Sequence, residues 1–592
     1  MSVASNARSG STTAGAFAGG ESAVPPDHRR ATATGRFNAH ARALLMAAFV
    51  LLAMAGGLLA PSPTLADEPP LPRIVEQDGR HALFVDGAPF LMLGAQVNNS
   101  SNYPEMLPEV WPVIRRIQAN TVEVPIAWEQ IEPREGQFDF SFLDTLLAQA
   151  RQNDVRLVLL WFGTWKNTSP NYAPAWVKLD NERFPRMMTA QGGTHYALSP
   201  HSRTTLEADK RAFVRLMRHL AEVDRQHTVI MVQVENEPGS YGSVRDFSPQ
   251  AQALFDGPVP AALLERLGKS PGNWRTVFGT DADEFFNAWA FASYIGEIAQ
   301  AGKAVKPLPM FANAALAAPF GRQPATTYAS GGPVHHVIDI YKVAAPALDL
   351  VAPDIYRRDH ASYLAYLDHY QRPDNALFVP ETGNDAEFAR YFFPVVGRGG
   401  LGFAPFGMDD TGYYNYPLGS KSLDDEILEP FVRNYGMFRP MAREWAAWAF
   451  EGKTWGAAEP DDPAAEHTQV MELGPYKAVA TFGQWQFGMD KPTGNPQPSG
   501  GVAIAQLGPD EYLVAGFLTR VSFQLASPTP GQAMLYERVE EGRFENGRWI
   551  FRRVWNGDQT DYGLNLTDRP RLLRVKLASY QGAAVIPVGN PN

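Results

Sequence analysis

Between residues 89 and 407 the chain carries eight short runs of nearly continuous apolar residues, and amphipathic segments separate them. Runs without polar alternation indicate strands buried on both faces, as in a parallel sheet. In the segments between them apolar residues recur three and four positions apart, which predicts helices that face a core. The helices include 142–152, 208–223 and 284–300, and the strands are 89–96, 120–128, 155–162, 227–237, 309–316, 348–356, 376–383 and 399–407.

Eight alternating units over residues 75–440 predict an α/β fold, a (β/α)8 TIM barrel that forms the catalytic domain. The alternative is an open, doubly wound parallel sheet. That fold is less favoured, because no glycine-rich phosphate loop follows the first strand. In a barrel of this kind the active site lies at the carboxyl ends of the strands.

After about residue 445 the pattern changes to strand-like runs punctuated by Gly-Pro and Asn-Gly, without helical periodicity. Residues 446–592 are therefore expected to form an all-β, sandwich-like domain. Two roles are open for it: it buttresses the barrel, or it is an independent carbohydrate-binding module. The predicted strands lie within 476–488, 500–525, 548–566 and 571–580.

Residues 1–66 differ from the rest of the chain. A basic, Ser- and Ala-rich stretch precedes the uncharged segment 43–60, and prolines and small residues follow it. This order is typical of a secretory signal, so the segment is excluded from the fold and the mature protein is expected in the periplasm or outside the cell. A retained membrane anchor is the alternative, because the apolar segment is almost long enough to span a bilayer.

The amino-acid composition argues against several classes of function. The net charge of −11 over 592 residues argues against nucleic-acid binding, and the absence of cysteine excludes thiolate chemistry and disulfides. His335 and His336 are the only adjacent histidines, and no further ligands stand at a spacing typical of a metal site. The sequence therefore predicts neither a metal nor a cofactor. The 13 Trp, 21 Tyr and 34 Phe fit a core and a sugar-binding cleft equally well.

Two of the predicted strands end in a single glutamate. Glu237 ends the fourth strand, in VQVENEPGSYG, and Glu381 ends the seventh, in ALFVPETG. Glycosidases use two carboxyl groups that face each other across the active site, here the barrel mouth. One protonates the leaving oxygen, and the other attacks the sugar or activates water. By this chemistry we assign Glu237 as general acid/base and Glu381 as nucleophile. The alternative is that each pairs with a cation at the top of the barrel.

The segment VQVENEPGSYG resembles the acid/base segment of glycoside hydrolase family 35, the β-galactosidases. The stretch WEQIEPREGQFDF is similar to the one that follows their second barrel strand, and VPETGND resembles a bacterial branch with a C-terminal β-domain, some members of which act on xyloglucan. The resemblance implies a retaining mechanism and a preference for β-galactosides. It departs at the third strand, where WFGTWKN replaces an acidic, Tyr-containing motif, so galactose contacts there do not transfer.

Other residues at the predicted strand ends are candidates for binding the sugar. Asn236 is expected to bind the 2-hydroxyl and Tyr356 to donate to Glu381, while Glu235 should face away and pair structurally. Packing or solvation is the alternative for each remaining candidate. These are the possible stacking platforms Trp128, Trp161 and Trp165 and the polar residues Glu129, Asn167 and Asn313.

The sequence thus predicts a retaining, exo-acting β-galactosidase whose partner is a carbohydrate and which has no stable membrane association once the signal is cleaved. An endo-acting β-glycanase of the cellulase or mannanase kind is the first alternative, because Asn-Glu-Pro occurs at the acid/base position of those barrels too. A non-catalytic carbohydrate-binding protein is the second.

Overall fold

The computed structural model describes residues 68–462, 465–483 and 494–582. The predicted signal segment and the end of the predicted strand 476–488 lie outside these residues. Within them, no helix combines the length and the apolar character needed to cross a membrane.

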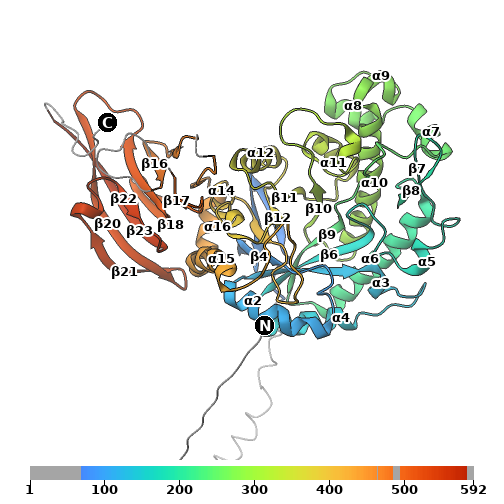
Figure 1. Ribbon diagram of the computed structural model, residues 1–592, viewed down its shortest axis with the longest axis horizontal. Coiled ribbons are helices and arrows are strands. Elements are labelled where there is room, and N and C mark those ends of the chain that lie inside the picture. Colours follow the sequence, from blue (N-terminus) through green and yellow to red (C-terminus); the bar gives the residue numbers. More distant parts are fainter. Residues whose placement is uncertain (1–67, 463–464, 484–493, 583–592) are drawn as a thin grey trace, which may run out of the picture. The chain divides into compact units, whose positions relative to one another are not determined.

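Eight parallel strands close into a barrel in the order β10-β11-β12-β13-β4-β5-β6-β9, which confirms the predicted fold class (Figure 1). Each lies within or overlaps one of the eight predicted apolar runs. Their bounds are β4 Met92–Gln96, β5 Thr121–Ala127, β6 Arg156–Lys166, β9 Val229–Asn236, β10 Met310–Ala315, β11 Leu350–Ile355, β12 Val379–Thr382 and β13 Gly402–Pro405.

A helix follows each barrel strand and packs its apolar face on the outside of the barrel. The three helices predicted from periodicity correspond to α4, α6 and α10. The helices are α2 Leu107–Ile117, α3 Trp128–Ile131, α4 Ser141–Gln152, α5 Ala175–Lys178, α6 Arg203–Val223, α7 Pro249–Asp256, α8 Ala261–Leu267, α9 Trp274–Phe278, α10 Ala282–Lys303, α11 Ile338–Ala344, α12 His360–Tyr370, α13 Ala386–Ala389, α14 Phe392–Gly397, α15 Asp425–Phe438 and α16 Ala442–Phe450.

The amino-terminal end of the barrel is plugged. Three short antiparallel strands precede the barrel: β1 Arg73–Gln77, β2 Arg80–Val85 and β3 Ala88–Pro89. Leu83 and Val85 of β2 are fully buried in one cluster with the inward-facing side chains of the barrel, including Val158 and Leu160. This plug leaves the carboxyl end as the open face, and the loops there include the small hairpin β7 Arg186–Met188 and β8 Thr194–Leu198.

The C-terminal region is built of two antiparallel sheets around a common apolar cluster, as predicted. Three strands were not predicted: β14, β15 and the long β20, whose sequence is highly charged. The six-stranded sheet has the order β14-β17-β18-β23-β20-β21 and the four-stranded sheet β15-β16-β19-β22. Their bounds are β14 Thr454–Ala458, β15 Thr468–Glu472, β16 Tyr476–Phe482, β17 Gly501–Gly508, β18 Glu511–Phe517, β19 Thr519–Leu525, β20 Gln532–Glu545, β21 Arg548–Trp555, β22 Leu564–Leu566 and β23 Arg571–Gln581.

These sheets pack on the barrel through α14, the helix that follows β12. Gly397 of α14 and Gly456 of β14 touch backbone to backbone, since a Cβ on either would overlap main-chain atoms of the other element. Beside them Phe393 meets Phe517 edge to face at 5.6 Å between ring centroids. The C-terminal sheets therefore pack on the barrel through a helix that follows the strand carrying Glu381.

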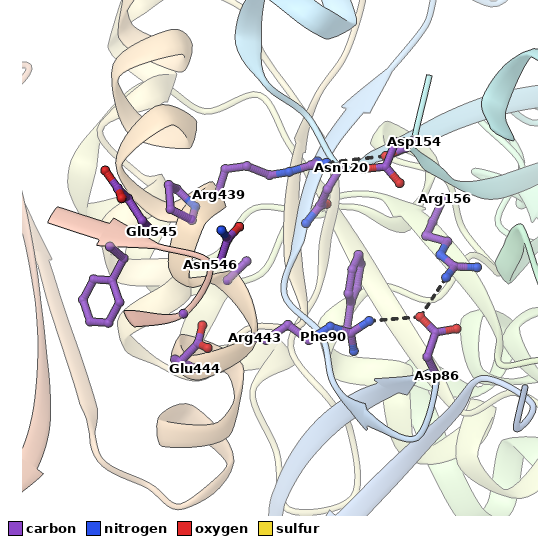
Figure 2. A pocket seen from close by; sticks show the side chains of 14 residues that line it. Asp86, Phe90, Asn120, Asp154, Arg156, Arg439, Arg443, Glu444, Glu545 and Asn546 are labelled. Carbon is purple, nitrogen blue, oxygen red and sulfur yellow. Dashed lines mark hydrogen bonds and ion pairs between the residues drawn. The ribbon is translucent and has the colours of Figure 1, made fainter. Parts of the chain in front are cut away.

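A cavity of about 790 Å³ lies at the amino-terminal end of the barrel, lined on one side by the β20–β21 turn. Figure 2 shows Asp86 there between Arg156 and Arg443, at 2.7 and 3.0 Å. Arg439 lies 3.5 Å from Asp154. The lining cations thus already have carboxylate partners.

Candidate active site

The two predicted glutamates meet at the carboxyl end of the barrel. Glu237 directly follows β9 and Glu381 lies in β12, and carboxylate oxygens of Glu237, Glu381 and a third acid, Asp354, all lie within 4.8 Å of one another. Asp354 is the register partner of Glu381 on the neighbouring strand β11. Glu381 and Asp354 are buried, whereas Glu237 is partly exposed.

Glu381 is held by two donors. Gln96 of β4 donates its side-chain N–H to Oε2 at 2.9 Å, and the Tyr356 hydroxyl donates to Oε1 at 2.6 Å. Tyr356 follows β11, where it was predicted to donate to this carboxyl. Gln96 was not predicted; its position at the end of the first barrel strand is the signal that could have found it. Both oxygens of Glu381 are thereby fixed in orientation.

Glu237 sits in a left-handed backbone conformation with φ of 44°, which is uncommon for a side chain of this size. Its N–H donates to Asn313 Oδ1 at 2.9 Å and its carbonyl accepts from the Thr168 N–H at 3.1 Å. Burial, reinforced by the charge of Glu381 and opposed by that of Lys166, raises the pKa of Glu237 to about 7. The carboxyl can therefore carry a proton near neutral pH, as a general acid must.

Asn236, predicted to bind the sugar, is fully buried, yet neither its amide nitrogen nor its amide oxygen has a hydrogen-bond partner among the described residues. An unsatisfied buried amide costs roughly 1–3 kcal/mol. Such a cost is tolerable where a ligand completes the bonds. The residue stands beside Lys166 in the register of β9 on β6, and the Asn167 N–H donates to its carbonyl at 3.2 Å.

Asp354 was not predicted and belongs to the same cluster. Burial, with the charges of Glu381 and Glu237, raises the pKa of Asp354 well above the ordinary range. Asn313 donates to Asp354 Oδ2 at 2.6 Å while accepting from Glu237. Asn313, predicted as a weak sugar ligand, thus uses both amide atoms to position the two acids.

Two further charged side chains were missed. Lys166, at the end of β6, is buried, and its ammonium donates to Asn167 Oδ1 and lies 5.2 Å from the Phe162 ring centroid. Glu123 of β5 is buried with both oxygens lacking partners among the described residues. Burial, then the charge of Glu381, raises the pKa of Glu123 well above its usual value. Both residues alternate correctly for the inside of the barrel, which is a usable signal.

The structure corrects the prediction of tryptophan stacking platforms. Trp128, Trp161 and Trp165 are fully buried on the helix-facing side of the barrel wall. Their indole N–H groups donate to Glu132, Asp209 and the Leu198 carbonyl, respectively. No ring face is left for a sugar, because strand alternation turns these positions away from the barrel mouth.

The remaining candidates divide. Glu129 forms an ion pair with Lys178 at 2.7 Å, whereas Asn167 stays exposed at the barrel mouth. Glu235 faces outward as predicted: it accepts from the backbone N–H groups of Thr164 and Trp165. It is also hydrogen-bonded to Asp209, and burial raises the pKa of both acids.

The three clustered acids are, among the described residues, the one group of carboxylates and imidazoles close enough together to hold a metal ion. Their bonding favours proton chemistry instead. Each oxygen of Glu381 accepts one hydrogen bond, from Gln96 or Tyr356. The pKa values of Glu237 and Asp354 are raised, which favours their protonated forms, and a protonated carboxyl is a poor ligand for a cation.

Comparison with known proteins places this region near β-galactosidases. Residues 102–289 match the model of glycoside hydrolase family 42, described as Beta-galactosidase, and residues 431–567 match a domain of unknown function, DUF5597. A curated relative, Beta-galactosidase BgaA of a Thermus species, is 28% identical over 187 residues, which is 29% of this chain and 27% of that protein. The alignment thus spans about a quarter of the relative's length.

Among solved structures, the β-galactosidase of Bacillus circulans sp. alkalophilus aligns over 82% of this chain and 99% of its own, with 9% identity and a TM-score of 0.48. That of the psychrophilic Marinomonas ef1 covers 62% of both chains at 12% identity and a TM-score of 0.44. The matching model is that of family 42, so the resemblance to family 35 is not confirmed, while the description as β-galactosidase is common to both. Residues 102–289 are therefore similar to family-42 β-galactosidases, and this part of the chain includes Glu237 but not Glu381.

Proposed function

We propose that the protein is a retaining, exo-acting β-galactosidase, with Glu237 as general acid/base and Glu381 as nucleophile. The observation that carries the proposal is the pair of carboxyl groups on opposite sides of the barrel mouth, with oxygens within 4.8 Å. Retaining glycosidases hold their carboxyl groups about 5–5.5 Å apart, and inverting ones about 6.5–9.5 Å to admit a water. The limit of 4.8 Å joins the nearest oxygens, so the two carboxyl groups lie close together, as the retaining route requires.

The reaction has two displacement steps. In the first, a Glu381 oxygen attacks the anomeric carbon while Glu237 gives its proton to the glycosidic oxygen; the bond to the leaving group breaks and a glycosyl ester of Glu381 forms. In the second, ionised Glu237 takes a proton from water, whose oxygen attacks the same carbon and releases Glu381. Two inversions restore the original configuration.

Around these acids, several side chains have roles that follow from their bonds. Gln96 and Tyr356 orient the nucleophile. Asn313 and Asp354 position Glu237. The unpartnered amide of Asn236 is placed to bind a sugar hydroxyl next to the reacting carbon. Galactosides from plant polysaccharides such as xyloglucan are the substrates that the motif resemblance suggests.

The test is a panel of 4-nitrophenyl β-glycosides, with the configuration of the first product followed by NMR. We expect the β-galactoside to be preferred and the β-anomer to form first. Preference for glucosides or mannosides, or cleavage of internal polysaccharide bonds alone, would favour the endo-glycanase alternative. Appearance of the α-anomer first would contradict the retaining route.

Azide separates the roles of the two acids. In Glu237→Ala the ester at Glu381 still forms from a nitrophenyl galactoside, and azide should capture it as the β-galactosyl azide. In Glu381→Ala azide takes the place of the missing nucleophile and should give the α-azide. Reversed products would exchange the two assignments.

A further inference from the structure

Exposed aromatic side chains of the barrel gather on one face. In residues 90–440 they all lie on connections that follow the carboxyl ends of barrel strands, and those connections lead toward the helices. Monomeric proteins expose single aromatics often, but grouping on the active-site face indicates a binding surface. The residues are Tyr103, Tyr196, Tyr241, Phe320, Tyr413 and Tyr416.

Two of these aromatics are tied to the general acid. The Thr168 N–H donates to the Glu237 carbonyl at 3.1 Å, and the Thr168 hydroxyl lies 2.6 Å from the Tyr196 hydroxyl. The same Tyr196 hydroxyl accepts from the Tyr241 N–H at 3.2 Å. A short chain of hydrogen bonds therefore connects Glu237, Tyr196 and Tyr241, and Tyr241 is only four residues beyond Glu237.

The pair is preorganised and still exposed. Tyr196 is 43% and Tyr241 42% exposed, so both rings keep an open surface. His195 contacts the Tyr241 carbonyl at 2.9 Å, and Ser240 and Ser330 exchange two backbone hydrogen bonds that anchor the loop. Partial burial and the nearby charge of Glu237 raise the pKa of Tyr241 to about 12, so its hydroxyl remains a donor. Fixed aromatic rings bind at a low cost in entropy.

We propose that Tyr196 and Tyr241 form the leaving-group subsite, which takes the pyranose ring attached to the β-galactosyl unit. The inference rests on the proposed role of Glu237, because the group that receives the proton must lie beside the acid that gives it. Ring faces stack on the C–H faces of a pyranose, and Tyr241 adds a hydroxyl donor. The enzyme is accordingly built for di- and oligosaccharides rather than for galactosides with small aglycones.

The test compares lactose with β-galactosyl fluoride, whose leaving group is too small to occupy the subsite. Tyr241→Ala is expected to lower kcat/KM for lactose about tenfold, the value of one aromatic stacking contact. Its kcat/KM for the fluoride should stay within about twofold of the unmodified enzyme. Tyr241→Phe, which keeps the ring and loses only the hydroxyl donor, should lose less activity on lactose than Tyr241→Ala. Tyr580→Ala is the matched control, since Tyr580 is 47% exposed on β23 of the C-terminal sheet, and neither substrate should respond to it.

The outcomes separate the inference from the function on which it rests. If the unmodified enzyme hydrolyses neither substrate, the proposed function falls and takes the subsite with it. If it hydrolyses both and Tyr241→Ala leaves their ratio unchanged, the subsite alone is wrong. An equal loss on the fluoride would assign Tyr241 a structural role, and a loss in Tyr241→Phe as large as in Tyr241→Ala would overturn the stacking.

Discussion

Polar and charged side chains have partners at one end of the barrel and lack them at the other. At the amino-terminal end the cations that line the cavity in Figure 2 have carboxylate partners, as in the pairs of Arg156 and Arg443 with Asp86. At the carboxyl end Glu123 and Asn236 are buried with no partner among the described residues. The cavity at the first end has its cations already paired, so it is a poor candidate for a ligand site. Unsatisfied polar groups at the second end mark a site that a ligand completes.

The strongest test of this contrast is to neutralise one acid at each end of the barrel. Glu381→Gln removes the proposed nucleophile and should lower kcat/KM on 4-nitrophenyl β-galactoside on the order of 10⁵-fold, as loss of a nucleophile does in other hydrolases. Asp86→Asn, the matched change at the paired end, should leave kcat/KM within about twofold, because surface ion pairs contribute at most about 1 kcal/mol to stability and none to the chemistry. Similar losses in both variants would contradict the contrast between the ends.

A smaller effect is expected from the cation of the active end. The charge of Lys166 opposes the rise in the pKa of Glu237, which stands at about 7. The proposed mechanism requires protonated Glu237, so activity should fall as the pH rises through about 7. Lys166→Met removes the opposing charge and should move this alkaline limb of kcat/KM to higher pH.

Glu237→Gln supplies the reference for that profile. It cannot deprotonate, so on an aryl galactoside with a good leaving group its activity should lack the alkaline limb altogether. An alkaline limb that persisted in Glu237→Gln would mean that another group is the acid.

The smallest expected effects concern stability, and they differ in sign between the two ends. Folding raises the pKa of Glu123 above its ordinary value near 4.5, so the unfolded chain loses this proton at lower pH than the folded one. Stability from this group is present at low pH and lost as the pH rises. Glu123→Gln should therefore gain stability relative to the unmodified protein as the pH increases from 4 to 8, whereas Asp86→Asn should lose about 0.5–1 kcal/mol near neutral pH. Thermal unfolding at both pH values measures the two changes. A Glu123→Gln difference independent of pH would show that folding leaves the pKa of this carboxyl unchanged.

The barrel could be predicted from the sequence because each of its strands is an apolar run of typical strand length. The sequence also predicted Glu237 and Glu381 as a pair because each stands at the end of an apolar strand. The prediction for the tryptophans was wrong because it did not apply strand alternation to them. Leu160 and Phe162 face the barrel interior, so Trp161 between them must face the helices.

Side-chain contacts between different strands could not be predicted from the sequence. Asp354 and Glu381 come together only because β11 and β12 are neighbours in register, and Gln96 reaches Glu381 from a strand 285 positions away along the chain. Strand β20 was not predicted because it contains no apolar run. Its charged residues, such as Arg538 and Glu540, form ion pairs on an exposed sheet instead. Pairing of this kind is a property of the assembled sheet.

The backbone contact between Gly397 and Gly456 limits where two such chains can be joined to make a chimeric protein. It joins a helix of the barrel to the first strand of the C-terminal sheets with no side chain between them. The similarity to DUF5597 begins only at residue 431, beyond α14. A chimera spliced at that boundary would bring its own strand against a foreign helix, and any residue larger than glycine at either position would hold the two apart. A chimera that keeps this contact must therefore take α14 together with the sheets.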